Sequence, residues 1–345
     1  INSQKATLTY TVLNPVESFF ATGEGFSWNT EDSDVETFII MANLNQQIRY
    51  WQAENATQRQ SSLKNLQYSG EMSLNIKAIG NVTTTGVEDN EITVLDSQFL
   101  GHHKQFTKLA KILDLGTDKG FFKFTKIPKA EDYVAEVYGA TEEGVIDTSN
   151  LILKTTLEDY SKRLKLNNGA NFVGYSDDIA VLSPENTYFI QVRAEADGET
   201  LLYAEYSNPI QAKVLADANS AGLTLVNNPE NQLDRKIIKV NVANSALGLW
   251  IVEDDKYTAV PIEEGTDRQY TFTPTVTQSG EKVLKFASYG TTSADPLNQH
   301  LLTSIFYTKH LNALEKPQIS ITGGIISWPT VSGADGYYVY INDNM

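Results

Sequence analysis

The stretch Leu182-Ser-Pro-Glu-Asn-Thr-Tyr188-Phe-Ile190-Gln-Val192-Arg-Ala194 carries the clearest structural signal in this chain. From Tyr188 to Ala194 every second side chain is apolar, which is the period of a β-strand with one buried face. An earlier stretch has apolar residues in the matching places, where Leu66, Met72, Ile76 and Ala78 correspond to Leu182, Tyr188, Val192 and Ala194. A strand pattern that recurs along one chain predicts a series of similar β units.

A second repeated pattern places a large aromatic residue on an apolar strand just before a polar corner. Phe124-Thr-Lys-Ile127-Pro-Lys-Ala130-Glu-Asp-Tyr133 matches Trp328-Pro-Thr-Val331-Ser-Gly-Ala334-Asp-Gly-Tyr337, and Gly25-Phe-Ser-Trp28 begins a third copy. Because alternate side chains of a strand share one face, we expect these rings in the interiors of separate units. The residues predicted to form the cores are Trp28, Phe124, Tyr133, Tyr188, Trp328 and Tyr338.

These repeats divide the chain into units of the size of a small β-sandwich. We expect complete units at 1–114, 115–216 and 217–314, of which the third lacks the aromatic signature and rests on apolar stretches separated by turn residues. Residues 315–345 supply only the first strands of a further, incomplete unit. Half a sandwich would expose its core, so we expect either that the chain continues beyond Met345 or that another chain completes the unit.

The aromatic strand, the Leu-x-Pro…Tyr-x-x-x-Val-x-Ala strand and the closing stretch Ser207-Asn-Pro-Ile210 resemble fibronectin type III-like and related Ig-like modules. Such modules occur in tandem on bacterial cell-surface and secreted proteins, and the resemblance is best over 115–216. It implies an all-β chain of tandem β-sandwiches, and it implies that Tyr188 makes a tyrosine corner, which Met72 cannot do. The resemblance is nearly silent on function, because these sandwiches host unrelated tasks.

One segment departs from the β pattern. Apolar residues recur there at helical spacing, and an Asn-Asn-Gly stop follows. These residues are Leu153, Leu157, Tyr160 and Leu164. We therefore expect one short helical insertion near 150–166, which serves either as a lid over an open edge of the sheet or as a binding epitope.

Composition excludes several classes of protein. Of 345 residues, 27 are Lys or Arg and 43 are Asp or Glu, so the net charge is −16. Without a basic stripe, nucleic acids and anionic membrane surfaces are disfavoured as partners. No apolar run approaches the ~20 residues of a membrane helix. Cysteine is absent, which excludes disulfides and thiol chemistry and fits both a cytosolic protein and a bacterial surface protein.

The sequence contains no motif for catalysis. A Gly-x-Ser-x-Gly elbow and a glycine-rich phosphate loop are both missing, so we expect no enzyme activity and no required cofactor. Calcium is the one ion considered, because carboxylates clustered in turns can supply its oxygen ligands. The alternative is that these residues simply form turns. The candidate ligands are Asp32, Asp34, Asp177, Asp178, Glu253, Asp254 and Asp255.

The adjacent aromatics Tyr50 and Trp51 are the candidates for a ligand contact, since they lie among polar residues outside the repeated core positions. They could stack on a sugar or pack internally. Trp250, in an alternating strand, is expected in a core. Our main hypothesis is a non-catalytic spacer, adhesive or assembly segment of an extracellular or cell-surface protein, whose partners are other protein domains or neighbouring subunits. The alternatives are a glycan-binding accessory region of a larger secreted enzyme and a filament or surface-layer subunit that assembles by strand complementation.

Overall fold

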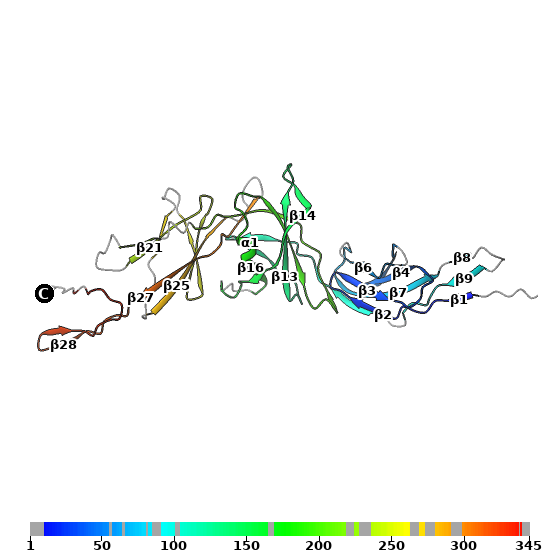
Figure 1. Ribbon diagram of the computed structural model, residues 1–345, viewed down its shortest axis with the longest axis horizontal. Helices are drawn as coiled ribbons and strands as arrows, with labels where there is room; N and C mark the ends of the chain where they lie inside the picture. The colour runs from blue at the N-terminus through cyan, green and yellow to red at the C-terminus, as the bar shows by residue number, and fades with distance from the viewer. Residues whose placement is uncertain are drawn as a thin grey trace, which may run out of the picture.

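A computed structural model describes residues 10–54, 57–63, 66–80, 82–84, 91–100, 104–164, 169–218, 224–227, 236–262, 269–272, 280–290, 299–337 and 339. The chain forms a row of β-sandwiches that follow one another between its two tips (Figure 1). The prediction of an all-β tandem sandwich fold is confirmed. In the described part of the chain the one helix is α1 (Asp177–Ala180), and none is long and apolar enough to cross a membrane.

Each of the first three sandwiches pairs a sheet of first, second and fifth strands with a sheet ordered seventh, sixth, third, fourth. In the first sandwich these sheets are β2 (Ser18–Ala21), β3 (Gly25–Asn29) and β6 (Gln60–Ser62), then β10 (Lys104–Lys108), β7 (Gly70–Gly80), β4 (Val35–Leu44) and β5 (Gln47–Gln52). The second has β11 (Gly116–Asp118), β12 (Phe121–Thr125), β16 (Asn171–Tyr175) and the added β15 (Glu158–Asp159), then β19 (Ile210–Val214), β17 (Tyr188–Glu195), β13 (Asp132–Ala140) and β14 (Ile146–Thr156). The third has β20 (Thr224–Asn227), β21 (Lys236–Asn241) and β24 (Gln269–Phe272), then β27 (Tyr307–Ala313), β25 (Gly280–Tyr289), β22 (Gly248–Glu253) and β23 (Lys256–Pro261). This shared order of strands is fibronectin type III-like.

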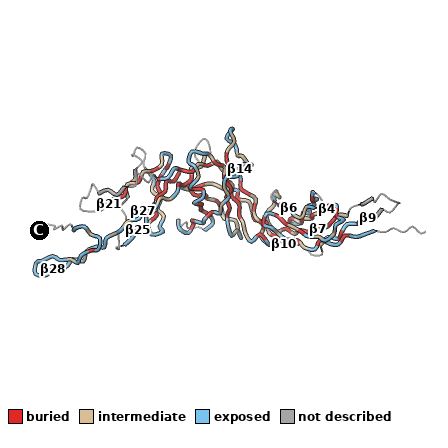
Figure 2. Tube along the Cα trace, in the orientation of Figure 1, coloured by how far each residue is buried: buried red, intermediate tan, exposed pale blue. Residues whose placement is uncertain are grey.

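Each of these sandwiches encloses a buried interior between its sheets (Figure 2). Trp28 is fully buried in the first, and Phe124, Tyr133 and Tyr188 are buried in the second. The hydroxyl of Tyr188 donates to the carbonyl oxygen of Ser183 at 3.2 Å, which is the geometry of a tyrosine corner. Among the described residues, the buried side chains of the third interior are aliphatic apart from Phe286, and they include Ile238 and Leu249.

The prediction that Trp328 lies in a core is wrong. Its strand β29 (Ile325–Ser327) pairs only with β28 (Ser320–Thr322), both strands are exposed, and Trp328 is half-buried. The physical reason is that no facing sheet covers these strands in the described part of the chain. Tyr338 lies outside the described residues. The corner itself matches the second sandwich, since the backbone N–H of Val331 donates to the hydroxyl of Tyr337.

The helical insertion predicted near 150–166 is also wrong. Residues 146–156 form β14, which pairs with β13 through contacts such as Val137 to Leu153. Leu157 and Tyr160 are buried where the chain crosses to the other sheet and turns. The helical spacing therefore arose from a strand, a crossing and a turn in succession, in a segment where β-branched residues favour the extended state. The helix that does form, α1, begins after the N-cap Ser176.

Candidate functional site: the joints between the sandwiches

The candidate ligand pair Tyr50 and Trp51 does not form a common surface. Both lie on β5, and successive side chains of a strand point to opposite faces. Tyr50 is 60% exposed, whereas Trp51 is half-buried, with its indole Nε1 donating to Ser61 Oγ at 3.3 Å. The ring of Trp51 lies 6.1 Å from that of the core residue Phe26. The two rings therefore cannot stack together on one face of a sugar.

The candidate calcium ligands are divided among separate turns. Asp32 accepts the backbone N–H of Asn14 at 2.6 Å, and Asp34 is exposed nearby. Asp177 and Asp178 form the first turn of α1, where carboxylates complement the helix dipole. Within the described residues no three acidic or histidine side chains gather as a metal site requires.

The third acidic cluster forms a tight turn between two strands. Glu253 ends β22, and Asp254 and Asp255 adopt the left-handed conformation, with φ of 49° and 58°. Asp254 pairs with Lys282 at 2.8 Å. These carboxylates are therefore placed by turn geometry and by a surface ion pair.

The arrangement that distinguishes this molecule is a set of strands that connect neighbouring sandwiches. We call β18 (Leu201–Leu202) and β26 (Gln299–Leu302) the linking strands, because each lies between the sixth and seventh strands of its own sandwich and pairs with the preceding one. In the first sandwich β9 (Glu91–Leu95) has the same place in the strand order, but it pairs with β8 (Val82–Thr84) and with a strand that precedes the sandwich. β18 pairs in parallel with β10 of the first sandwich, which makes the first joint. β26 pairs in parallel with β19 of the second sandwich, which makes the second joint.

The backbone contacts of the two joints are equivalent. Leu109 N–H donates to the carbonyl oxygen of Leu202 at 3.0 Å, and Leu215 N–H donates to that of Leu302 at 3.1 Å. The pairing recurs at the N-terminal tip, where β1 (Tyr10–Val12) lies parallel to β9 and Leu13 N–H donates to Leu95 at 3.1 Å. The residues of these hydrogen bonds are leucines in all three places, and β18 and β26 each bring a leucine to the edge of a seventh strand.

Each joint also contacts the turn between the first and second strands of the preceding sandwich. The N–H of Tyr203 donates to Gly23 O at 2.9 Å, and the N–H of Thr303 donates to Gly120 O at 3.0 Å. Both glycines have a positive φ, of 76° and 79°, and a Cβ at either position would overlap Tyr203 or Thr303. Glycine therefore permits both the turn conformation and the close approach of the next sandwich.

Charged side chains dominate the first joint. Arg193, on the sixth strand of the second sandwich, reaches Glu24 of the first sandwich at 2.7 Å and also donates to Glu195 at 2.7 Å. Its guanidinium lies 4.9 Å from the ring centre of Tyr203 and 4.8 Å from that of Tyr206. This planar cation is thus paired and stacked at once, which suits arginine better than lysine.

A buried carboxylate continues this network behind Arg193. Glu136 accepts hydrogen bonds from the hydroxyls of Tyr206, at 2.5 Å, and Tyr138, at 2.6 Å, and lies 3.6 Å from Lys154. Burial alone would raise the pKa of Glu136, but the hydrogen bonds from Tyr138, Tyr206 and Gln191 and the charge of Lys154 outweigh it, so the pKa lies below its usual value. Glu136 is therefore ionised at neutral pH.

Lys108 contributes a second cation to the first joint. It occupies the last position of β10 and is almost fully buried. Its ammonium donates to the carbonyl oxygens of Leu63 and Leu66, at 3.1 and 2.6 Å, and to Glu205 of the next sandwich at 3.2 Å. Burial lowers the pKa of Lys108, and the hydrogen bond and charge of Glu205 partly restore it. The ammonium thus depends on groups from both sandwiches.

Asp197 shapes the loop that presents the linking strand β18. Its carboxylate accepts the backbone N–H groups of Glu199, Thr200 and Leu201 at 2.8–3.0 Å, and the Thr200 hydroxyl at 2.8 Å. These hydrogen bonds, that from Leu201 first, lower the pKa of Asp197 to about 2. The loop that enters the first joint is therefore built on a carboxylate that stays ionised.

Aromatic side chains dominate the second joint. Trp250, on the third strand of the third sandwich, is buried in the core cluster of the second sandwich rather than in its own. Its ring lies 5.3 Å from Phe121 and 5.6 Å from Tyr289, and its Nε1 donates to the carbonyl oxygen of Lys119 at 3.0 Å. An aromatic side chain of this size removes about 150–250 Å² from water, so the second joint extends one hydrophobic core into the next sandwich.

Hydrogen bonds complete the second joint with few charges. The buried hydroxyl of Tyr175 donates to the carbonyl oxygen of Thr303 at 2.7 Å. On β26, His300 lies with its Nδ1 2.9 Å from the hydroxyl of Thr117. Burial lowers the pKa of His300, so the imidazole is held neutral in the joint.

The sequence reading missed the linking strands. They are short, and their pairing partners belong to another sandwich, so periodicity within a unit does not reveal them. One signal was present, since the leucine pairs Leu201-Leu202 and Leu301-Leu302 each stand between the sixth and seventh strands of their sandwiches. Trp250 was expected in a core and is buried, but in a core that two sandwiches share.

Comparisons with known proteins do not assign this chain to a family. No protein-family model matches the chain, and no curated protein matches it. Among solved structures, the FN1–FN3 domains of chicken CNTN1 match over 87% of this chain and 98% of that one, with 10% identity and a TM-score of 0.19. The assignment of a fibronectin type III-like fold therefore rests on the strand order of the three sandwiches.

Proposed function

We propose that this chain is a non-catalytic structural segment of an extracellular or cell-surface protein, in which jointed sandwiches form a stiff spacer between the groups at its two ends. The observation that carries the proposal is the linking strand. Each joint adds a backbone strand pair and a buried leucine to the side-chain contacts, so neighbouring sandwiches cannot rotate without breaking backbone hydrogen bonds.

Distances between spin labels test this stiffness directly, because the chain has no native cysteine to interfere. Tyr50→Cys, in the first sandwich, and Leu151→Cys, in the second, place labels at exposed positions. Double electron–electron resonance should give one narrow distribution of label-to-label distances across the first joint. The matched control adds Leu202→Asp, which puts a charge into the buried contact and should broaden the distribution. A broad distribution without that substitution would contradict the proposal.

Adhesion through exposed edges belongs to the same proposal, whereas glycan binding has less support. A spacer presents its faces repeatedly along its length, which favours contacts with other protein domains. The separation of Tyr50 from Trp51 leaves the proposed sugar contact without its second ring. Affinity electrophoresis in polysaccharide gels tests the alternative, and retardation that Tyr50→Ala abolishes would restore it.

A further inference from the structure

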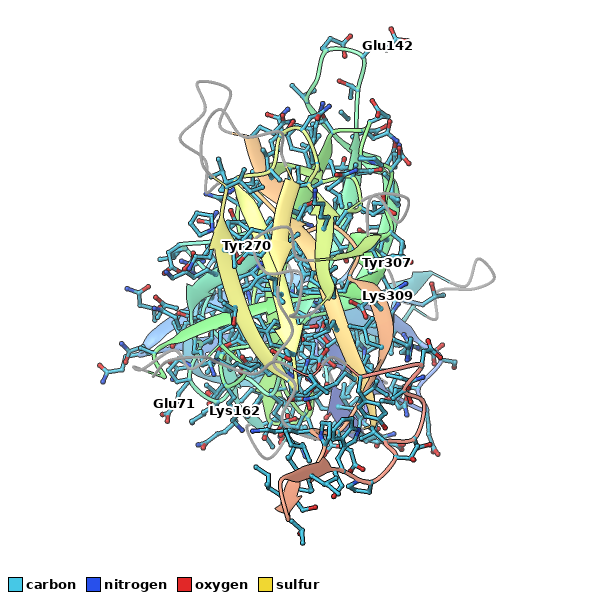
Figure 3. The ribbon with its side chains drawn as sticks, turned by 90° about the vertical axis from the view of Figure 1, so that its left-hand side faces the viewer. Glu71, Glu142, Lys162, Tyr270, Tyr307 and Lys309 are labelled. Carbon is cyan, nitrogen blue, oxygen red and sulfur yellow. The ribbon has the colours of Figure 1, made fainter. Side chains whose placement is uncertain are left out.

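The third sandwich repeats the acceptor half of a joint without its linking strand. β27 is the seventh strand and lies at the edge of its sheet in the described part of the chain. Its register on β25 corresponds to that of β19 on β17, so Leu314 takes the place of Leu109 and Leu215. Leu109 is 3% exposed and Leu215 is 6% exposed, whereas Leu314 is 45% exposed. Figure 3 labels Tyr307 and Lys309 on this strand.

We propose that the outer edge of β27, with Leu314, binds the linking strand of a further fibronectin type III-like unit, the unit that β28 and β29 begin. The inference rests on the proposed function, since it extends the same joint by one step. The occupant is an extended segment that runs parallel to β27 and places a leucine beside Leu314, as Leu202 and Leu302 are placed beside Leu109 and Leu215.

Two observations point to this occupant rather than to an unrelated protein. In both complete joints the linking strand comes from the sandwich whose first strands directly follow the seventh strand. β28 and β29 directly follow β27, and their corner repeats that of the second sandwich: Ile127 N–H donates to the Tyr133 hydroxyl at 2.8 Å, as Val331 N–H does to that of Tyr337. The exposed edge therefore lies where the next sandwich would meet it.

Disulfide trapping with a peptide tests the proposal, because it detects weak pairing and the chain supplies no competing thiol. The probe has the sequence of residues 297–304, with cysteine in place of Gln299 or Leu301. The full chain carries His310→Cys or Asn312→Cys, which correspond to Gln211 and Lys213, the partners of Gln299 and Leu301 in the second joint. Mixed disulfides are measured by intact mass under reversible redox conditions.

Parallel docking in the proposed register should favour the matched pairs, 310 with 299 and 312 with 301, over the crossed pairs. Replacing Leu302 in the peptide by Asp should reduce trapping by about tenfold, since an apolar contact is lost. Thr258→Cys, on the exposed strand β23 at the opposite edge of the same sheet, is the matched control and should show no dependence on Leu302.

Preference for the crossed pairs, indifference to Leu302, or equal trapping at Thr258→Cys would each overturn the proposal. Light scattering of the unmodified chain examines the other occupant. Concentration-dependent dimerisation that Leu314→Asp abolishes would reassign the edge to a second copy and overturn the choice of occupant. Because none of these measurements alters β18 or β26 within the chain itself, their failure would leave the stiffness of the two complete joints, and so the proposed function, untouched.

Discussion

The first and second joints share a backbone and differ in almost every side chain. Both pair a linking strand in parallel with a seventh strand, and both seat a residue of the next sandwich on a glycine turn. Around that frame the first joint assembles Arg193, Lys108 and Glu136, whereas the second inserts Trp250 into a neighbouring core. The comparison shows that strand pairing sets the geometry, while the side chains decide how each joint responds to solvent conditions.

The largest difference should come from removing the ring at the second joint. Trp250→Ala leaves a cavity in the shared core and removes the hydrogen bond to Lys119, which should cost about 3–5 kcal/mol. Hydrogen exchange at the Leu215 amide should accelerate strongly, whereas the equivalent Leu109 amide should change little. Leu247→Ala, at an exposed site just before the same strand, is the control. Equal acceleration at both amides would show that the joints open together.

The corresponding change at the first joint should be smaller. Arg193→Leu keeps the apolar bulk but removes the cation paired with Glu195 and leaves Glu24 only Lys154, at 4.0 Å. Because Glu24 is half exposed, we expect a loss of about 1–2 kcal/mol. Exchange at the Leu109 amide reports it. Lys126→Leu removes a partly exposed pair with Asp159 and should have almost no effect. If Arg193→Leu left exchange at the Leu109 amide unchanged, the ion pairs of Arg193 would not stabilise the first joint.

Acidification should affect the stability of the two joints differently, by less than either of these substitutions does. Burial lowers the pKa of His300 in the folded joint, so stability is present above the ordinary value of 6.5 and is lost as the pH falls below it, because the open state binds the proton more readily. Exchange at Leu215, corrected for the intrinsic pH dependence, should rise severalfold between pH 7.5 and 5.5. His300→Asn should abolish the change. A rise that persists in this variant would assign the effect to another group.

Salt should produce the smallest difference between the joints, and here the first joint should be the more sensitive one. At 1 M ionic strength the screening length falls to about 3 Å, which weakens the pair between Arg193 and the half-exposed Glu24 by up to about 1 kcal/mol. The aromatic contacts of Trp250 carry no such dependence. Exchange at Leu109 should therefore rise with sodium chloride while exchange at Leu215 stays constant. The opposite ranking would contradict the assignment of a charged and an aromatic joint.

The sequence predicts the interior of each sandwich better than its connections. Alternation around Tyr188 and the aromatic strand of Phe124 depend on contacts within one unit, and both residues are buried. The helix near 150–166 failed because the spacing of Leu153 and Leu157 was read without the partner strand β13. The joints could not be predicted from periodicity, since pairing between residues 109 and 202 leaves no periodic trace in either segment.

The parallel pairing has a consequence for synthesis on the ribosome. The edge of β10 stays open until the chain has been extended from Leu109 to Leu202, because the strand that covers it belongs to the following sandwich. At about 5–20 residues per second this takes roughly 5–20 s, during which a finished sandwich presents an unpaired edge to its neighbours. In the first two sandwiches this edge is therefore covered by the following sandwich, so these two edges close in the order in which the sandwiches are translated.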